Sequence, residues 1–304
     1  MRSAVAVQSE ELRILRNEPM SRHTSWRVGG PADIWFRPRN RAELVRFLAE
    51  LPPGTPIHWV GLGSNLLVRD GGIRGAVIST AGGLDTLTDL GGGLVEAEAG
   101  VPCTVLARQC ARWNIGPAAF FAGIPGTVGG ALTMNAGAFG DDTWRHVESV
   151  EVLDRHGEVR TRRPDDYRVS YREVHGPGGE WFLAARFRFD PAQPTSLDAV
   201  RTLVAERQAK QPIGQPSCGS VFRNPEGDFA GRLIEAAGLK GHRIGGAEVS
   251  AKHANFIINS ASATAADIEA LIRHVQVTVM ERSGIQLVPE VHITGEARLP
   301  GGGS

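Results

Sequence analysis

The sequence has few cysteines, no long apolar run and no net charge. Its three cysteines, Cys103, Cys110 and Cys218, are odd in number and show no C-x-x-C spacing, which argues against a disulfide framework and a structural zinc site. No stretch reaches the roughly 18 uncharged apolar residues of a membrane span, and charges interrupt the N-terminus, unlike a secretory signal. We therefore expect a cytoplasmic protein without a metal centre.

The balance of charges excludes another class. Lysine plus arginine is 33 and aspartate plus glutamate is 33, so a nucleic-acid binder that works through a general basic surface is disfavoured. A local basic pocket for a phosphorylated metabolite stays possible. A chain of 304 residues is too long for one ordinary core and predicts two or three compact units.

The coarse pattern of helices and strands predicts an α+β protein in three units. Asn40 caps a helix over 40–51, and Glu43 completes a capping-box pattern. Thr264 caps another helix over 265–282, which Gly284 closes. We place the units at 1–80, 81–190 and 195–298, and we expect a disordered tail at 299–304. The third unit carries helices at 197–210, 229–237 and 265–282 and strands at 255–258 and 286–293.

Glycine is abundant, with 38 residues, and it gathers in two informative loops. Residues 61–65 read Gly-Leu-Gly-Ser-Asn after a predicted strand, so their backbone N–H groups form either a tight turn or an anion-binding nest. Residues 123–130 read Gly-Ile-Pro-Gly-Thr-Val-Gly-Gly, without a charge. That segment suits backbone lying against a flat or phosphorylated cofactor, although close packing between two elements would also explain it.

Two isolated polar residues are candidates for chemistry. Ser220 stands in Cys-Gly-Ser-Val-Phe, and Glu290 stands within an apolar run that we expect to form a strand. A buried carboxylate is costly unless it is paired or protonated. Glu290 therefore either has a structural cation partner or takes part in proton chemistry, and nothing in the sequence joins it to Ser220.

Together these motifs resemble the UDP-N-acetylenolpyruvoylglucosamine reductase family. The matching runs occur in the family's order and cover roughly residues 23 to 296. They lie at residues 24–32, 61–67, 123–130, 219–225, 253–256 and 289–291.

The resemblance implies a three-domain flavoprotein, with an FAD-binding pair of domains of the vanillyl-alcohol-oxidase (PCMH) type and a C-terminal substrate domain. It places the pyrophosphate and ribityl chain of FAD against both glycine loops and the small residues that follow. The implied cofactor residues are Gly61, Gly63, Ser64, Asn65, Leu66, Gly123, Ile124, Pro125, Gly126, Thr127, Gly129, Gly130, Asn135 and Gly137.

The family's catalytic arginine, serine and glutamate match Arg172, Ser220 and Glu290. Two Tyr-Arg pairs compete for the arginine: Arg168 has the family's serine two residues on, whereas Arg172 keeps the ungapped spacing from the preceding turn. We choose Arg172. The stretch from Arg172 to Ser220 is short for family members with an extra substrate-covering loop, so this chain resembles the subtype without it.

The resemblance implies reduction of UDP-N-acetylglucosamine enolpyruvate to UDP-N-acetylmuramate, for peptidoglycan, by FAD that NADPH reduces. Arg172 and Glu290 would stabilise the charge that develops, and Ser220 would protonate C2. Tyr171, Lys210, Asn224 and His253 would hold the substrate. We expect a monomer that binds neither nucleic acid nor membranes. Alternatives are another flavin oxidoreductase of this fold, or a flavin or nucleotide-sugar binding protein without catalysis.

Overall fold

The computed structural model describes residues 12–298. The expectations for the N-terminus up to residue 11 and for a tail at 299–304 lie outside these residues. The N-terminal part is a four-stranded sheet in the order β1-β2-β5-β3, in which only β1 runs antiparallel to its neighbour. Its strands are β1 (Ile14–Pro19), β2 (Pro31–Phe36), β3 (Ile57–Val60) and β5 (Ile73–Ser79).

Helix α1 (Arg41–Glu50) covers this sheet with an apolar face. The Asn40 side chain accepts the Glu43 amide N–H at 2.9 Å, which confirms the predicted cap. The capping box is incomplete, however, because the Glu43 carboxylate accepts the Arg39 amide N–H instead of that of Asn40.

The middle of the chain forms an antiparallel five-stranded sheet in the order β11-β10-β14-β7-β6. One core contains Cys103 and Cys110, both buried as expected, and burial raises the pKa of Cys110 to about 12. The strands are β6 (Leu87–Gly91), β7 (Leu94–Glu98), β10 (Val147–Asp154), β11 (Val159–Arg162) and β14 (Glu180–Arg188). The helices packed there are α2 (Cys103–Trp113), η2 (Ala119–Gly123) and α3 (Val128–Met134).

Short elements complete this part of the chain. They are η1 (Met20–Arg22), β8 (Gly137–Ala138), β9 (Asp141–Asp142), η3 (Thr143–His146), η4 (Pro164–Asp166), β12 (Arg168–Ser170) and β13 (Glu173–His175). The pair β12 and β13 forms a hairpin whose turn is Tyr171 and Arg172.

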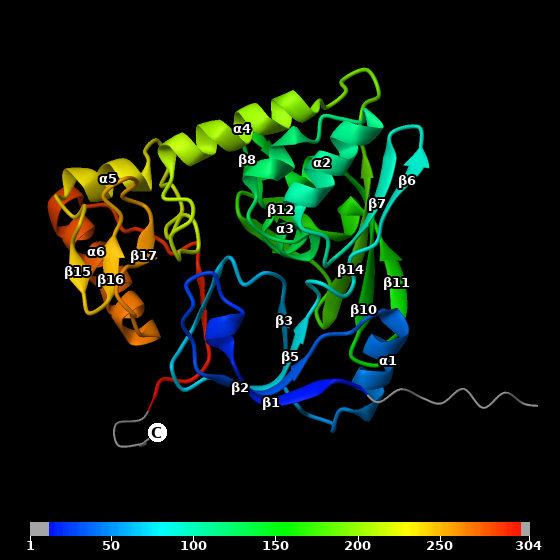
Figure 1. Cartoon of the computed structure of the whole chain (residues 1–304), viewed down its shortest axis with the longest axis horizontal. Helices are drawn as coiled ribbons and strands as arrows, with labels where there is room; N and C mark the ends of the chain where they lie inside the picture. Colours follow the sequence, from blue (N-terminus) through cyan, green and yellow to red (C-terminus); the bar gives the residue numbers. More distant parts are fainter. Residues whose placement is uncertain (1–11, 299–304) are drawn as a thin grey trace, which may run out of the picture.

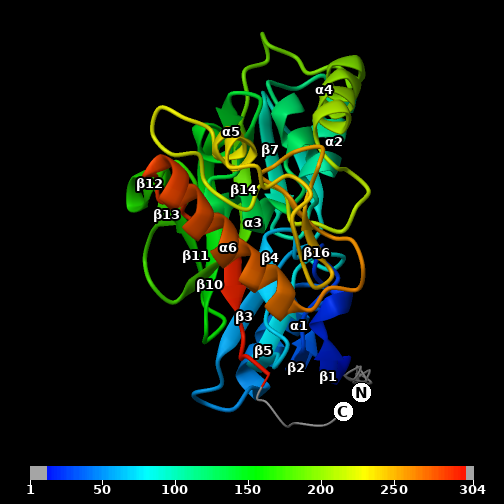
Figure 2. The same ribbon diagram turned by 90° about the vertical axis from the view of Figure 1, so that its left-hand side faces the viewer.

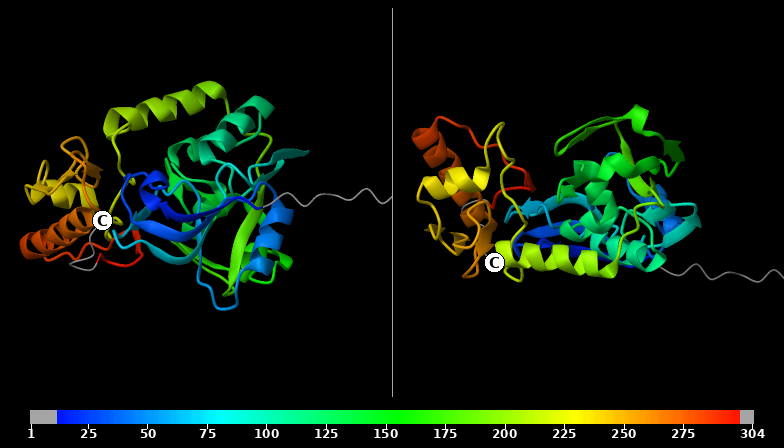
Figure 3. Two further views of the ribbon diagram at one scale, coloured as in Figure 1. Left: turned by 60° about the horizontal axis from the view of Figure 1, so that its bottom comes forward. Right: turned by 90° about the horizontal axis from the view of Figure 1, so that it is seen from above.

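Helix α4 (Leu197–Lys210) spans the distance between the middle and the C-terminal parts (Figure 1). We expected it to pack within the third unit, but its buried Val200 and half-buried Val204 join the core of α2 and η2. The C-terminal part lies beside the other two in both views of Figure 3. It contains α5 (Ala230–Ala236), α6 (Ala265–Ser283) and the sheet β15 (Arg243–Ile244), β16 (Ala247–Val249) and β17 (Ile257–Asn259).

The predicted caps of α6 are confirmed. Thr264 and Asp267 exchange side-chain bonds with each other's amide N–H, and Gly284 ends the helix with φ 71°. Helix α6 crosses the face shown in Figure 2, next to β4 (Leu66–Val68). No helix within residues 12–298 is long and apolar enough to cross a membrane.

The end of the chain returns to its beginning. Strand β18 (His292–Thr294) pairs in parallel with β4, and the Trp26 indole donates a hydrogen bond to the Ile257 carbonyl at 2.7 Å. The strand predicted over 286–293 is therefore confined to its last residues. Glu290 is not inside a strand: it lies between an isolated bridge that joins Phe222 to Pro289 and the start of β18.

Candidate active site

A cavity of about 970 Å³ lies where the three parts of the chain meet. Its walls include β3 and the loop after it, residues 123–134, the β12–β13 hairpin, the end of α4 and the segments around Ser220 and Glu290. This volume is at the upper end of the roughly 300–1,000 Å³ that ligand pockets occupy. A large cofactor or a cofactor with part of a substrate would fill it.

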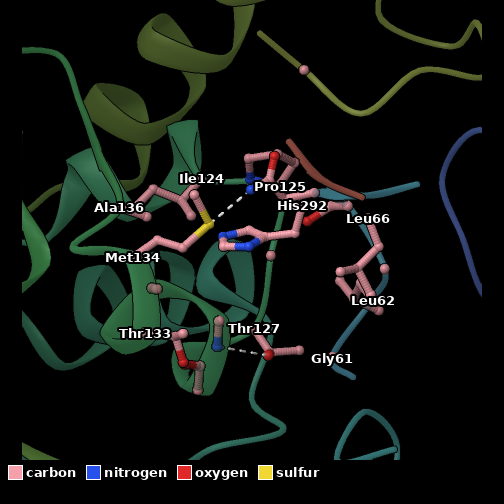
Figure 4. A pocket seen from close by; sticks show the side chains of 18 of the residues that line it. Gly61, Leu62, Leu66, Ile124, Pro125, Thr127, Thr133, Met134, Ala136 and His292 are labelled. Atoms are coloured by element: carbon pink, nitrogen blue, oxygen red, sulfur yellow. Dashed lines mark hydrogen bonds between the residues drawn. The ribbon is translucent and has the colours of Figure 1, made fainter. Parts of the chain in front are cut away.

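The two glycine loops lie side by side in the wall of this cavity, with Gly61 next to Thr127 (Figure 4). A Cβ atom at Gly61 would collide with the Thr127 hydroxyl, and one at Gly126 would lie 3.4 Å from Ser64 Oγ. Gly63 has φ 62°, and a Cβ there would collide with the His23 carbonyl. Glycine is therefore required at Gly61 and Gly63, whereas a Cβ at Gly126 would make only an ordinary contact.

Nearly all the predicted cofactor residues line the cavity. They are Gly61, Gly63, Ser64, Asn65, Leu66, Gly123, Ile124, Pro125, Gly126, Thr127, Gly129, Gly130 and Gly137. Asn135 is not in the lining, because its side chain is used within the protein. Its Oδ1 accepts the Trp144 amide N–H at 3.1 Å, and its Nδ2 donates to the Ser170 carbonyl at 3.3 Å.

Arg172 and Glu290 meet at the cavity wall. Arg172 Nε lies 3.0 Å from Glu290 Oε1, and Arg172 Nη2 donates to the Gly137 carbonyl at 3.1 Å. Arg172 has φ 58°, a left-handed conformation that is uncommon for a residue other than glycine. Arg168, in β12, is exposed and does not line the cavity. The geometry therefore groups Arg172, and not Arg168, with Glu290.

Backbone pairing brings Ser220 next to Glu290, which the sequence alone did not indicate. The Glu290 amide donates to the Val221 carbonyl at 2.7 Å, and the Asn65 side chain donates to the Glu290 carbonyl at 3.0 Å. Ser220 lines the cavity and is partly exposed. Its hydroxyl has no hydrogen-bond partner within residues 12–298, so it is free to donate to a ligand.

Burial dominates the electrostatics of this wall. The Glu290 side chain is 14% exposed, and burial raises the pKa of its carboxyl, although Arg172 and Arg223 act in the opposite direction. Burial, together with the Glu290 charge, also raises the pKa of the Cys218 thiol. Cys218 is therefore a neutral, inert group, as we expect of a buried cysteine.

The predicted substrate residues do not gather in one place. Lys210, at the end of α4, lines the cavity. Tyr171 is exposed, and its ring centroid lies 5.3 Å from the Arg172 guanidinium carbon. Asn224 and His253 lie outside the lining: Asn224 Oδ1 accepts the Ala230 amide N–H, and burial lowers the pKa of His253.

Several lining residues escaped the sequence analysis. Arg207 lies one helical turn before Lys210 and hydrogen-bonds Gln211 at 2.7 Å, and burial lowers its pKa. Met134 accepts a hydrogen bond from Asn65, and His292 lies beside it (Figure 4). Helical spacing from Lys210 could have indicated Arg207. His292 could not be found this way, because it reaches the site through the distant pairing of β18 with β4.

The described residues offer no site for a metal ion: within residues 12–298 no group of three or more His, Cys, Asp or Glu side chains could hold one.

Residues 32–162 match the family described as FAD binding domain, and residues 211–294 match the family described as UDP-N-acetylenolpyruvoylglucosamine reductase, C-terminal domain. Fold, glycine-lined cavity and family match define an FAD-dependent oxidoreductase with an α+β flavoprotein fold, as predicted.

Relatives of similar length narrow the class. The UDP-N-acetylenolpyruvoylglucosamine reductase of Alkalilimnicola ehrlichii is 59% identical over 96% of this chain and 97% of its own. That of Methylococcus capsulatus is 54% identical over 93% and 94%. The crystal structure of the Thermus caldophilus reductase superposes with a TM-score of 0.76 at 32% identity, over 93% of this chain and 98% of that one. The chain belongs to the UDP-N-acetylenolpyruvoylglucosamine reductase family.

Proposed function

We propose that this protein reduces UDP-N-acetylglucosamine enolpyruvate to UDP-N-acetylmuramate in peptidoglycan precursor synthesis, with NADPH as the reductant. The observation that carries the proposal is the meeting of Arg172, Ser220 and Glu290 at one wall of a glycine-lined cavity. These residues come from three distant segments. Family membership supports the same reaction.

The residues present fit FAD. The two glycine loops offer a cradle in which side chains would collide, and the cavity is large enough for a dinucleotide. Residues 61–65 and 123–130 would hold the cofactor's pyrophosphate and ribityl chain through backbone N–H groups and the Ser64 and Thr127 side chains. When bound, FAD supplies the hydride chemistry that no side chain of the protein can provide.

Arg172 would stabilise the charge that develops in the substrate. Hydride addition at C3 of the enolpyruvyl group places negative charge on C2 and on the adjoining carboxylate. A guanidinium held in advance by Glu290 and by the Gly137 carbonyl stabilises that charge without reorganising. Glu290 thus orients Arg172, and its partial burial strengthens the interaction between them.

Ser220 would supply the proton that completes the reaction. Its hydroxyl is free of protein partners in residues 12–298 and opens onto the cavity. A serine hydroxyl is a weak acid, so it transfers a proton only to a strongly basic carbon such as the charged C2. The new C2–H bond forms as the O–H bond of Ser220 breaks, and solvent restores the hydroxyl proton.

The proposal includes the substrate contacts and the division of the chain. Lys210 would meet the substrate diphosphate, and Tyr171 would lie beside the enolpyruvyl group near Arg172. Asn224 and His253 would act after a movement that brings them toward the cavity. We propose units at 1–80, 81–190 and 195–298, of which the third begins with α4 packed on the core of the second. We also propose assignment to the subtype without the substrate-covering loop.

An anaerobic two-step absorbance experiment tests the function. NADPH is added to the FAD-loaded protein and should bleach the flavin band. UDP-N-acetylglucosamine enolpyruvate is then added and should restore the colour, whereas UDP-N-acetylglucosamine, the control without the double bond, should not. Bleaching without recolouring by the enolpyruvyl sugar would refute the substrate. NADH in place of NADPH, at equal concentration, tests the reductant.

A further inference from the structure

Arg223 connects the two segments that carry Glu290 and Arg172. Its amide donates to the Val288 carbonyl at 2.9 Å, which fixes it beside the Glu290 segment. Its guanidinium Nη2 donates to the Arg172 carbonyl at 3.3 Å, in the turn between β12 and β13. One side chain of the C-terminal part thus holds the backbone of a residue in the middle part.

The backbone that Arg223 holds is in an unfavourable conformation. Arg172 has φ 58° and carries a long side chain. A non-glycine residue in this region is strained and persists only where its surroundings fix it. Two interactions with the C-terminal part hold it: the ion pair of the Arg172 side chain with Glu290, and the bond from Arg223 to the Arg172 carbonyl. The Arg172 side chain also donates to the Gly137 carbonyl.

Positive charges outnumber negative ones around Glu290: two arginines interact with this one carboxylate. The groups that interact with it are Arg172 from the hairpin, and Arg223 and Cys218 from the segment around Ser220. His292, two residues further along the Glu290 segment, interacts with Arg223. Both guanidiniums lower the pKa of Glu290, and burial together with Arg223 lowers that of His292. Arg223 itself makes no ion pair within residues 12–298, and its buried Nε has no hydrogen-bond partner there.

Such an arrangement is costly unless the extra positive charge has a use. Arg223 is partly buried, and a guanidinium that gives up part of its hydration without an anionic contact is destabilising by itself. The charge of Arg223 stabilises the site when Arg172 binds an anionic ligand. Glu290 then shares Arg172 with that ligand, and Arg223 remains as a second cation near the Glu290 carboxylate. The site holds two cations and one anion, which leaves room for one further negative group from a ligand.

We propose that Arg223 is a positioning residue for the reaction: it fixes the strained Arg172 turn and is the counter-charge of Glu290 when Arg172 engages the substrate carboxylate. The role of that carboxylate depends on the function proposed above. Arg223 need not touch the substrate, and it does not line the cavity.

Arg223→Met, which keeps the length but removes the charge, tests the proposal by its pH profile. We expect kcat to fall about tenfold, the effect of about 1.4 kcal/mol, with little change in KM for the sugar. The acid limb of kcat should move to higher pH, because Glu290 loses a group that favours its ionised form. Arg223→Lys keeps the charge and should restore the position of the limb. Arg243→Met removes an exposed arginine paired with Glu248 and should change neither.

A second measurement does not depend on turnover. Thermal unfolding midpoints of Arg223→Met, Glu290→Gln and the double variant should be non-additive, because the two groups interact. Additive midpoints together with an unmoved acid limb would overturn the proposal. If the wild-type protein binds FAD but ignores the enolpyruvyl sugar, the proposed function fails, while non-additive midpoints would still support the link between Arg223 and Glu290.

Discussion

Arg172 and Arg168 belong to the same hairpin but have different surroundings. Arg172 lines the cavity beside Glu290, whereas Arg168 is exposed. We expect Arg172→Lys to lower kcat by about 100-fold, the usual cost of removing a preorganised group that stabilises developing charge. A lysine has a single ammonium group and cannot contact Glu290 and the Gly137 carbonyl at once, as the Arg172 guanidinium does. Arg168→Lys should stay near the wild-type rate in the same steady-state assay.

The comparison decides between the two Tyr-Arg pairs that the sequence offered. Both variants keep a positive charge, so they share any general electrostatic effect. FAD content, measured by absorbance, should be equal in the two. A large loss in Arg168→Lys with a normal rate in Arg172→Lys would reverse the assignment.

Glu290 makes stability depend on pH in a defined direction. Burial raises the pKa of its carboxyl in the folded protein above the unfolded value of about 4.3. The folded state then binds the proton more tightly, so the stability contributed by Glu290 is complete below the unfolded pKa and declines as pH rises through the folded pKa. Glu290→Gln, which mimics the protonated form, should therefore match the wild type in acid and exceed its unfolding temperature at neutral pH.

Thermal unfolding of both proteins, followed by circular dichroism across this pH range, measures that difference. The apo proteins are used, so that ligand binding does not contribute. Glu281→Gln, an exposed carboxylate near the end of α6, is the control and should follow the wild type throughout. A Glu290→Gln variant less stable than the wild type at neutral pH would show that the ion pair with Arg172 outweighs the cost of burial.

At the scale of elements, the loops of the cavity depend on the absence of side chains. We expect Gly61→Ala to displace Thr127 and to weaken FAD binding, because its new Cβ would occupy the position of the Thr127 hydroxyl. Gly178→Ala is the matched control: no atom lies within 4 Å of its added Cβ, its φ is ordinary, and it is outside the cavity lining. FAD affinity, titrated by quenching of flavin fluorescence, should fall for the first variant alone.

Elements encoded by local signals were predicted well. Helix α6 begins and ends where Thr264, Asp267 and Gly284 indicate, because capping depends on residues within one turn. The strand expected around Glu290 was wrong, since an apolar run does not reveal which partner pairs with it: only residues 292–294 find β4. The prediction that α4 packs within the third unit was also wrong, because the sequence of a helix does not indicate which core Val200 will join.

The candidate site was predictable in its loops but not in its connections. The composition of residues 123–130 indicated backbone that lies against a cofactor or packs closely between two elements, and the structure places most of these residues in the cavity wall. The junction of Ser220 with Glu290 depends on a backbone bond between Val221 and Glu290, which no local pattern encodes. The left-handed turn at Arg172 was likewise invisible, because it depends on tertiary contacts made by a residue that rarely adopts it.

At the scale of the whole molecule, the cavity is lined by residues from the N-terminal, middle and C-terminal parts of the chain. The C-terminal core includes Trp26, Val28 and Leu67 from the N-terminal part, and β18 pairs with β4 directly after the loop at 61–65. The loop that lines the cavity and the segment of Glu290 are therefore held by the same pairing. Occupation of the cavity should stabilise all three parts together.

Thermal unfolding with and without FAD tests this coupling. A ligand that binds only the folded state adds about 2.7 kcal/mol at 100 times its Kd, so we expect the unfolding midpoint to rise by several degrees in one cooperative transition. Riboflavin lacks the pyrophosphate that residues 61–65 and 123–130 would hold, and it should raise the midpoint less at equal concentration. If the C-terminal part unfolded in a separate transition unmoved by FAD, the pairing of β18 with β4 would be too weak to couple the substrate wall to the cofactor loops. A rise of the whole transition would mean that FAD binding also stabilises the wall formed by Ser220 and Glu290.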